Sequence, residues 1–172
     1  MQAGELIATD RPELTEESIK LAWSVLDEVM DPEVPVVSLT DLGIVREITP
    51  VGGVLQVVLT PTYSGCPATE HIEQSAKRAL EDSGFNAVTI EQRLAPAWTT
   101  DWITKRGRLR LKEYGIAPPI GSADKPQLDQ AIPCPVCDST NTKEITEFGS
   151  TACKALYQCN DCLEPFDYFK CI

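Results

Sequence analysis

The sequence TPTYSGCPATE at residues 60–70 connects an apolar run to a helix and presents one cysteine between them. The apolar run before it, residues 54–59, predicts a strand. Pro67 is favoured at the first position of a helix, because its fixed φ suits the helix and its missing N–H would be unpaired there. Cys66 is therefore predicted at the helix N-cap, where free amides and the helix dipole favour a thiolate that binds metal or acts as a nucleophile. The alternative for Cys66 is a small buried residue at a turn.

The residues around this loop predict three helices and a small sheet. Helices are expected where apolar residues recur every three or four positions, and strands where apolar residues alternate between turn signals. In chain order the predicted elements are a helix at 15–30, strands at 44–49 and 54–60, a helix at 67–83, a strand at 88–94 and a helix at 100–114. Pro32 and Pro35 end the first helix and predict an extended segment after it. This order is typical of an α+β fold, which would fill residues 1–115.

Composition limits the classes of function. The 172 residues include 15 basic and 26 acidic side chains, a formal net charge of −11. Because such a chain repels phosphate backbones and anionic lipid, neither nucleic acid nor a membrane is expected as a partner. Residues 1–13 lack the basic start and long apolar stretch of a signal peptide, so a cytoplasmic location is expected. Seven cysteines in a reducing compartment favour metal ligands or reactive thiols over disulfides.

One segment concentrates positive charge against this acidic background. The helix expected at 100–114 carries five basic residues, which are Lys105, Arg106, Arg108, Arg110 and Lys112. A solvated helix face is the favoured interpretation, and a docking patch for an acidic partner is the alternative.

The C-terminal segment carries a second motif. Residues 116–132 are rich in Pro, Gly and Ser and predict a linker. Residues 133–172 then contain two CxxC pairs at a separation that predicts a tetrahedral four-thiolate site made of Cys134, Cys137, Cys159 and Cys162. A module this short buries too little apolar surface to fold alone, and a bound metal would therefore stabilise it. Its short strands are expected at 143–148, 155–158 and 165–169. Zinc is the default ion, and iron or an iron–sulfur cluster fits the same ligands.

Two cysteines are left over. Cys153 and Cys171 lie outside both CxxC pairs. They are interpreted as reduced bystanders, with a second thiol pair or alternative metal ligands as the other hypotheses.

Several short motifs resemble a known family. DPEVPV at 31–36, DLGIV at 41–45, GCP at 65–67 followed by Glu70, and APAWT at 95–99 occur in this order. Over residues 15–115 they resemble the small α+β iron–sulfur assembly factors that include the bacterial SufT proteins and the eukaryotic cytosolic targeting factors. The tail, with FGSTACKAL at 148–156 and CLEPFDYFKC at 162–171, resembles the cysteine ribbon of the PaaD family of phenylacetate degradation. Members of that family are accessory components of the phenylacetyl-CoA epoxidase system.

The resemblance implies maturation rather than catalysis. It implies that Cys66 is the reactive cysteine and transiently holds iron or an iron–sulfur cluster, and that four carboxylates shape its surroundings. These carboxylates are Asp31, Glu33, Asp41 and Glu70. Two of them also have simpler interpretations. Asp31 can be the residue that ends the first helix, and Asp41 can be the cap of the turn before Gly43.

Three functional hypotheses follow. In the first, the protein delivers a cluster or iron to the reductase or the di-iron oxygenase component of the epoxidase, and the ribbon docks the client. In the second, it is a zinc-stabilised scaffold subunit that delivers no metal. In the third, Cys66 and His71 form a cysteine enzyme, which is disfavoured because five positions along a helix turn a side chain by about 140°. The partners expected are therefore epoxidase components, and a homodimer is compatible with each hypothesis.

Overall fold

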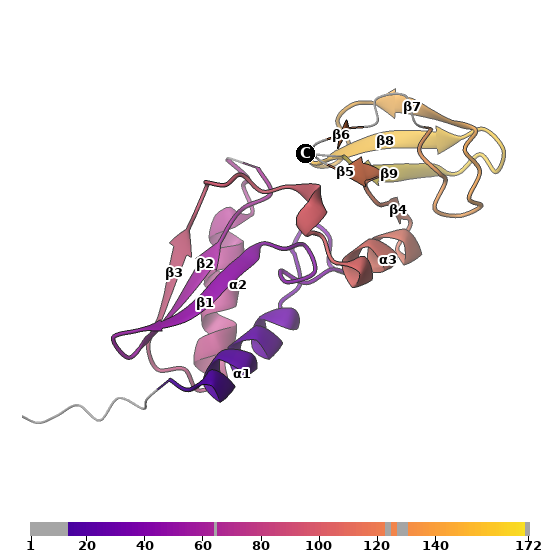
Figure 1. Ribbon diagram of the computed structural model, residues 1–172. Coiled ribbons are helices and arrows are strands. Elements are labelled where there is room, and N and C mark those ends of the chain that lie inside the picture. Colours follow the sequence, from indigo (N-terminus) through magenta and orange to yellow (C-terminus); the bar gives the residue numbers. More distant parts are fainter. Residues whose placement is uncertain (1–13, 64, 123–124, 127–130, 171–172) are drawn as a thin grey trace, which may run out of the picture.

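The computed structural model describes residues 14–63, 65–122, 125–126 and 131–170. Helix α3 and strand β4 connect two lobes (Figure 1). We call residues 14–115 the N-terminal lobe and the described residues from 116 to 170 the ribbon lobe. The helices are α1 (Glu16–Asp27), α2 (Thr69–Asp82), the 3-10 helix η1 (Thr100–Trp102) and α3 (Lys105–Glu113). The strands are β1 (Val45–Val51), β2 (Val54–Leu59), β3 (Val88–Gln92), β4 (Ile116–Ala117), β5 (Gly121–Ser122), β6 (Lys125–Pro126), β7 (Thr142–Thr146), β8 (Lys154–Cys159) and β9 (Pro165–Phe169).

The N-terminal lobe is a three-stranded sheet covered by two helices. The strand order is β1-β2-β3, in which β1 and β2 pair antiparallel and β2 and β3 pair parallel. Helix α2 is the crossover between the two parallel strands, and α1 and α2 pack against each other and against the sheet (Figure 1). The predicted α+β fold class is confirmed by this mixture of helices and sheets, and each predicted strand and helix of this lobe has a counterpart.

Helix α1 begins at Glu16, one residue after the predicted start, and Thr15 is its N-cap. The Thr15 hydroxyl accepts a hydrogen bond from the Ser18 amide, and the Ser18 hydroxyl accepts one from the Thr15 amide, both at 3.3 Å. This reciprocal capping satisfies amides that the first turn leaves unpaired.

The segment after α1 does not run extended, which corrects the prediction made from Pro32 and Pro35. Residues 32–37 form bends and a turn, and a bridge between Met30 and Ser38 closes the loop. Asp31 folds the chain back, because its Oδ1 accepts hydrogen bonds from two amides that follow it in the chain. A short acidic side chain therefore outweighs the local preference of the prolines.

The ribbon lobe is a four-stranded sheet in the order β4-β9-β8-β7. Strand β4 comes from the segment predicted to be a linker, and it pairs parallel with β9 through Ile116 opposite Asp167. The linker prediction is therefore wrong for Ile116 and Ala117, because both residues are buried apolar residues that complete this sheet. Strands β5 and β6 form a small antiparallel pair of their own.

A single hydrophobic core crosses the boundary between the lobes. Besides the residues of the sheet, α1 and α2, it includes Ile116, Cys153 and Phe169 of the ribbon lobe. The Phe169 ring lies 6.2 Å from the Trp98 ring, centroid to centroid, and the Trp98 indole donates to the Leu42 carbonyl at 2.9 Å. The ribbon lobe is thus packed into the N-terminal lobe rather than tethered to it.

The helix predicted at 100–114 is two helices. Ile103 has an extended backbone between η1 and α3, and the Thr104 hydroxyl caps α3 by accepting the Gly107 amide at 2.9 Å. Gly107 is required there, because a Cβ atom at this position would lie 2.9 Å from the carbonyl oxygen of Asp41. This close approach brings α3 against the loop that carries Asp41.

The basic residues of α3 are mostly engaged inside the molecule. Arg108 donates to the carbonyls of Thr100 and Pro119, and Lys112 pairs with Asp138 of the ribbon lobe at 2.6 Å. Arg106 and Arg110 pair with aspartates of the N-terminal lobe. Four of the five basic side chains therefore pair within the molecule, while Lys105, Arg106 and Lys112 remain exposed, as expected of a solvated helix face.

Candidate functional site

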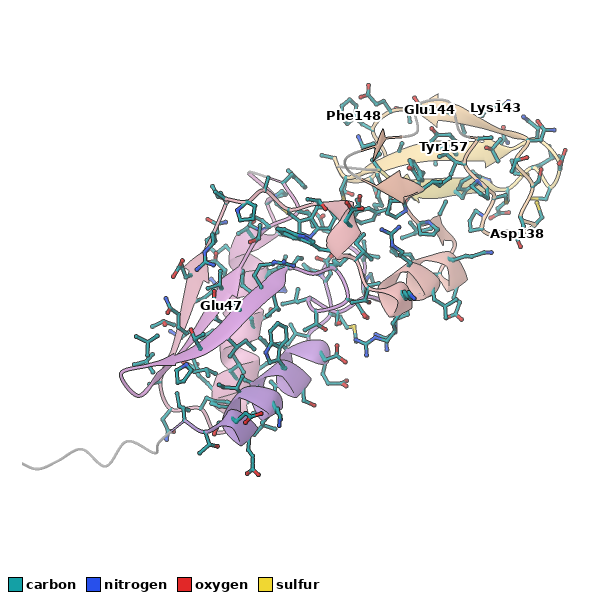
Figure 2. The ribbon with its side chains drawn as sticks, viewed as in Figure 1. Glu47, Asp138, Lys143, Glu144, Phe148 and Tyr157 are labelled. Atoms are coloured by element: carbon teal, nitrogen blue, oxygen red, sulfur yellow. The ribbon has the colours of Figure 1, made fainter. Side chains whose placement is uncertain are left out.

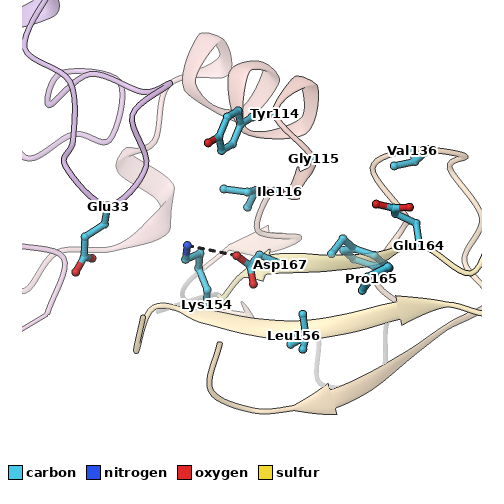
Figure 3. A pocket seen from close by; sticks show the side chains of 11 residues that line it. Glu33, Tyr114, Gly115, Ile116, Val136, Lys154, Leu156, Glu164, Pro165 and Asp167 are labelled. Carbon is cyan, nitrogen blue, oxygen red and sulfur yellow. Dashed lines mark ion pairs between the residues drawn. The ribbon is translucent and has the colours of Figure 1, made fainter. Parts of the chain in front are cut away.

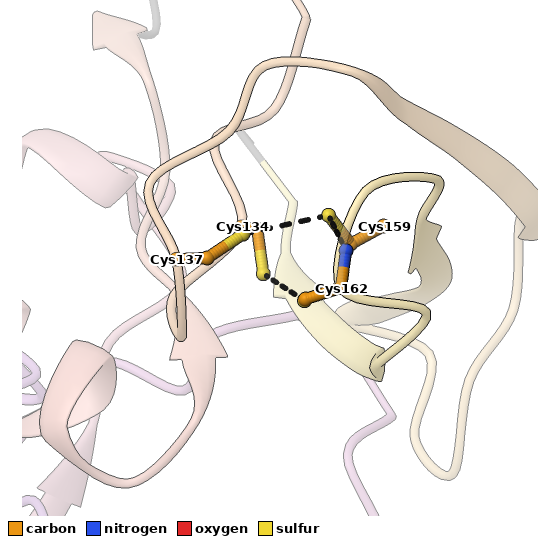
Figure 4. A group of neighbouring side chains, drawn as sticks. All are labelled: Cys134, Cys137, Cys159 and Cys162. Carbon is orange, nitrogen blue, oxygen red and sulfur yellow. Dashed lines mark hydrogen bonds between the residues drawn. The ribbon is translucent and has the colours of Figure 1, made fainter.

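The four cysteines of the two CxxC pairs meet at one end of the ribbon lobe. Cys134 and Cys137 come from the turn before β7, Cys159 ends β8, and Cys162 lies in the turn before β9 (Figure 4). All four sulfur atoms lie within 4.8 Å of one another, with 3.7 Å between Cys134 and Cys162 and 3.6 Å between Cys137 and Cys159. This arrangement matches the four-thiolate site that the spacing predicts.

The two cysteine turns have matching backbones. The residue after each pair, Asp138 in one and Leu163 in the other, has a positive φ of 59° and 66° respectively. The Cys162 amide points to the Cys159 sulfur at 3.5 Å. This amide, with that of Asp161, lowers the pKa of the Cys159 thiol to about 7. An amide directed at sulfur stabilises a thiolate at Cys159, and the four converging sulfurs fit a tetrahedral ion.

Aromatic packing supports the cysteine turns from inside the ribbon lobe. Tyr157 contacts the rings of Phe166 and Tyr168, with centroid distances of 5.9 Å and 5.7 Å. Its hydroxyl donates to Glu144 on the neighbouring strand at 3.0 Å (Figure 2). The buried core of this lobe is small and includes Cys134 and Cys159 themselves, so the sulfur site is part of what holds the lobe together.

Cys66 does not occupy the helix N-cap, which corrects the sequence prediction. Helix α2 begins at Thr69, and its N-cap residue is Ala68. The Cys66 carbonyl accepts the Thr69 amide at 3.2 Å, so residues 66–69 form a turn of their own before the helix starts. The helix dipole therefore does not act on Cys66 in the way that Pro67 suggested.

The Cys66 sulfur has polar neighbours although the residue is only 8% exposed. Cys66 lies outside both hydrophobic core clusters of the described residues. The Cys66 amide donates to the Tyr63 carbonyl at 3.4 Å. Burial, then hydrogen bonding to the Cys66 side chain and the negative charges of Cys66, Glu33 and Cys153, raise the pKa of the Tyr63 phenol to about 12. Tyr63 therefore stays protonated at neutral pH and can donate a hydrogen bond to the sulfur.

Two of the predicted carboxylates lie in the same region. Asp31 is 7% exposed, and its Oδ1 accepts the amides of Glu33 and Val34 at 2.8 Å each. Burial raises the pKa of Asp31 despite these two hydrogen bonds. Burial and the neighbouring charge of Asp31 also raise the pKa of Glu33, and the charge of Lys154 opposes this.

Asp41 has a different environment. Its side chain is fully buried; Oδ1 accepts from Arg106 Nε at 2.7 Å and from the Thr104 hydroxyl at 2.8 Å, and Oδ2 pairs with Arg110 at 2.9 Å. Burial acts to raise the pKa of Asp41, but the hydrogen bonds from Arg106 and Thr104 and the two arginine charges outweigh it and lower the pKa. Arg106 also pairs with Asp27 of α1. Both Asp41 oxygens are thus engaged in anchoring α3.

Glu70 and His71 belong to the exposed surface of α2. Glu70 lies in the first turn and accepts a hydrogen bond from Gln74 at 3.1 Å. His71 is also exposed. Of the four predicted carboxylates, Asp31 is buried and Glu33 is half-buried with its charge acting on Tyr63, whereas Asp41 and Glu70 have other partners.

The cleft between the lobes brings in residues that sequence reasoning did not select. It has a volume of about 500 Å³, with Glu33 on the N-terminal lobe and Lys154, Asp167 and Ile116 on the ribbon lobe (Figure 3). Lys154 is buried and pairs with Asp167 at 3.3 Å. Cys153, which immediately precedes Lys154, was one of the two unassigned cysteines, and its position outside both CxxC pairs was its only signal. The other, Cys171, lies outside the described residues.

No helix in the described part of the chain is both long enough and apolar enough to cross a membrane.

Comparisons with known families agree with this division into two lobes. The family described as "Iron-sulfur cluster assembly protein" matches residues 22–91, which contain Asp31 and Cys66. The family described as "PaaD zinc beta ribbon domain" matches residues 119–170, which contain all four cysteines of the sulfur site. The two matches account for most of the chain.

Individual proteins with similar sequences or folds come from the same two families or resemble the N-terminal lobe. The chain is 53% identical over 150 residues to a putative 1,2-phenylacetyl-CoA epoxidase subunit of Escherichia coli K12, covering 87% of this chain and 91% of the relative. It is 32% identical over 90 residues to an Fe-S protein maturation auxiliary factor of Porphyromonas gingivalis, covering 51% of this chain and 84% of that protein. A domain of unknown function, DUF59, from Bacillus anthracis has a similar fold, with a TM-score of 0.50, 23% identity and coverage of 54% of this chain and 89% of that domain.

Proposed function

Because the chain belongs to the PaaD family of phenylacetyl-CoA epoxidase subunits, we propose that it is an accessory subunit of an epoxidase of this kind and assists the insertion of iron or an iron–sulfur cluster. The similarity to an Fe-S protein maturation auxiliary factor over the N-terminal lobe supports the maturation part of this proposal. The reductase and the di-iron oxygenase of the epoxidase system would be the clients.

The observation that carries the proposal is the environment of Cys66. A sulfur that is nearly buried and has a protonated tyrosine beside it is suited to binding a metal species as cargo. A hydrogen bond from Tyr63 withdraws electron density from a thiolate, and such outer contacts tune how firmly a ligand holds its metal. Iron held by so few protein groups would exchange readily, which delivery requires.

The ribbon site has a structural role in this proposal. Four sulfurs that converge from two turns form a closed site with no position left for a substrate, which is typical of structural zinc. Bound zinc would hold Cys134, Cys137, Cys159 and Cys162 and supply folding free energy to the ribbon lobe. It would take no part in the transfer itself.

A second candidate is a zinc-stabilised scaffold that delivers no metal. The displacement of Cys66 from the N-cap of α2 favours it, because the sulfur then lacks the stabilisation that the helix dipole would supply. The shared core of the two lobes also suits a rigid adaptor between epoxidase components.

Anaerobic purification separates the two candidates. Iron, zinc and visible absorption would be measured for the wild-type chain and for Cys66→Ser, with His71→Ala as a control at an exposed neighbouring position. Delivery predicts that Cys66→Ser loses iron, visible absorption and support of epoxidase activity in cells, while one zinc per chain remains. A colourless zinc protein whose serine variant still supports the epoxidase would refute delivery and favour the scaffold. Loss of activity in His71→Ala would instead revive the cysteine-enzyme hypothesis.

A further inference from the structure

The cleft between the lobes is bordered by residues of both lobes and of both cysteine turns (Figure 3). Tyr114, the C-cap residue of α3, lies on the N-terminal lobe, as does Glu33. On the ribbon lobe, Val136 lies inside the first CxxC pair, and Glu164 follows the second pair by two residues. The four-cysteine site therefore positions one wall of this cleft. Its volume of about 500 Å³ lies in the range of ligand-binding pockets.

Large apolar side chains reach solvent at the edge of the cleft. Tyr114 is 56% exposed and Val136 is 64% exposed. Deeper in the cleft, Ile116 and Phe166 are buried residues of the ribbon sheet. An exposed aromatic ring beside a hollow with apolar walls marks a protein interaction site, because tyrosine is enriched at interfaces. Both Tyr114 and Val136 thus remain more than half uncovered by the described part of the chain.

The charges of the cleft do not balance. Its lining includes three carboxylates, those of Glu33, Glu164 and Asp167, and one ammonium group, that of Lys154. Lys154 is buried and is already paired with Asp167 at 3.3 Å, so these two charges compensate each other. Among the described residues, neither Glu33 nor Glu164 has an ion-pair partner. Two negative charges therefore remain at the cleft without a paired positive charge.

These observations separate the classes of ligand that the cleft can take. An anionic ligand would meet two unpaired carboxylates, while the single lysine is neutralised by Asp167. A metal ion is also disfavoured, because within the described chain only the four ribbon cysteines gather three or more potential ligand atoms within 4.8 Å. Cationic side chains flanked by apolar ones complement both the charge and the walls of the cleft. Lysine and arginine supply such a charge on a long apolar stem.

We propose that the cleft between the lobes docks a segment of a partner protein in which lysine or arginine residues lie next to a large apolar side chain. The cationic groups pair with Glu33 and Glu164, and the apolar side chain packs against Tyr114 and Val136. This inference goes beyond the proposed function, because it concerns a surface other than that of Cys66. It rests on the proposed function only for the identity of the partner, which is a component of the epoxidase.

Binding to purified epoxidase components would test this inference. The zinc-loaded full chain is titrated by biolayer interferometry with the purified reductase and, separately, with the purified di-iron oxygenase. One of the two is expected to bind the wild type. Glu33→Gln and Glu164→Gln should each weaken that binding by roughly 5–30-fold, because each removes one partner of a charge pair at a partly solvated interface. Glu33→Lys and Glu164→Lys should weaken it further, because they add a repulsion to the loss of the pair.

Two further variants keep the outcome interpretable. Tyr114→Ala removes the exposed ring and should weaken binding by about 10-fold, which tests the apolar part of the surface. Glu147→Lys makes the same change of charge at an exposed residue of the ribbon lobe that does not line the cleft, so it should bind as the wild type does. Zinc content and the thermal midpoint of each variant verify that it is folded.

The possible results separate the inference from the proposed function. Weaker binding in the Glu33, Glu164 and Tyr114 variants, with Glu147→Lys unaffected, supports docking at the cleft. Equal affinity of all variants refutes it, and so does a wild type that binds neither component. Stronger binding after Glu33→Lys or Glu164→Lys would show an anionic occupant and refute it as well. Cys66→Ser should dock with wild-type affinity, so the iron measurements decide the proposed function independently of each of these outcomes.

Discussion

Replacement of Phe169 by alanine should destabilise the N-terminal lobe, although Phe169 belongs to the ribbon lobe. The side chain is 1% exposed and packs in the shared core beside the Trp98 ring. A free ribbon would leave this ring in solvent, and its removal would then cost the N-terminal lobe nothing. The variant therefore tests whether the two lobes form one cooperative unit.

The expected loss of stability follows from the burial of the ring. Truncation of a fully buried phenylalanine to alanine costs about 3–5 kcal/mol, because transfer free energy is lost and a cavity remains. For a chain of this size, each kcal/mol lowers the unfolding temperature by about 2–4 °C, so the midpoint should fall by roughly 6–20 °C. The matched control is Phe148→Ala on the same lobe. Phe148 is 61% exposed, and its described ring contact is with Lys170, 4.3 Å from the ring centroid, which is worth about 0.5–1 kcal/mol.

Differential scanning calorimetry of the zinc-loaded chain provides the assay. One transition is expected for the wild type, and Phe169→Ala should move all of it to lower temperature. Two resolved transitions in the wild type, with the one assigned to the N-terminal lobe unmoved in the variant, would show that the lobes unfold independently. Equal shifts of the midpoint in Phe148→Ala and Phe169→Ala would also refute the shared core as the cause.

Two further variants test the metal site and the anchoring of α3. Cys159→Ser should abolish stoichiometric zinc binding and unfold the ribbon lobe. It should also lower the unfolding midpoint of the N-terminal lobe, because Phe169 and Cys153 then leave the shared core. Amide NMR would check this prediction, and an intact set of ribbon-lobe signals would contradict it. Asp41→Asn should cost about 1–3 kcal/mol in urea unfolding, since it removes a buried charge whose arginine partners are partly solvated. Because the folded pKa of Asp41 lies below its ordinary value of 3.8, this stabilisation is complete at neutral pH and is lost as pH falls through the lowered pKa. The difference between wild type and Asp41→Asn should therefore shrink in acid, and a difference that grows below pH 4 would contradict the ion-pair explanation.

The turn at residues 31–34, which begins the DPEVPV motif, shows what a family motif predicts about individual residues and what it does not. The motif predicts Asp31 and Glu33 as a group, but it does not distinguish their roles. Asp31 shapes the turn with one oxygen, whereas Glu33 reaches the cleft between the lobes. Asp41, from the neighbouring DLG motif, is an anchor for two arginines of α3. These roles depend on which side chains arrive from elsewhere in the chain.

The features that the amino-acid sequence by itself determined are those made by neighbours in the chain. Each CxxC turn directs its two sulfurs through a few backbone angles, so the local pattern was sufficient to predict that the four sulfurs meet. The hairpin of β1 and β2 and the α+β order followed from periodicity in the same way.

Only the tertiary structure decided the surroundings of Cys66, Asp41 and Cys153. Cys66 lost its expected N-cap position because a separate turn precedes α2, and Asp41 found partners more than sixty residues away in α3. Cys153 entered the core of the other lobe because the ribbon sheet packs there through Phe169. Burial and charge pairing between distant segments depend on how the whole chain packs, so no local sequence pattern predicts them.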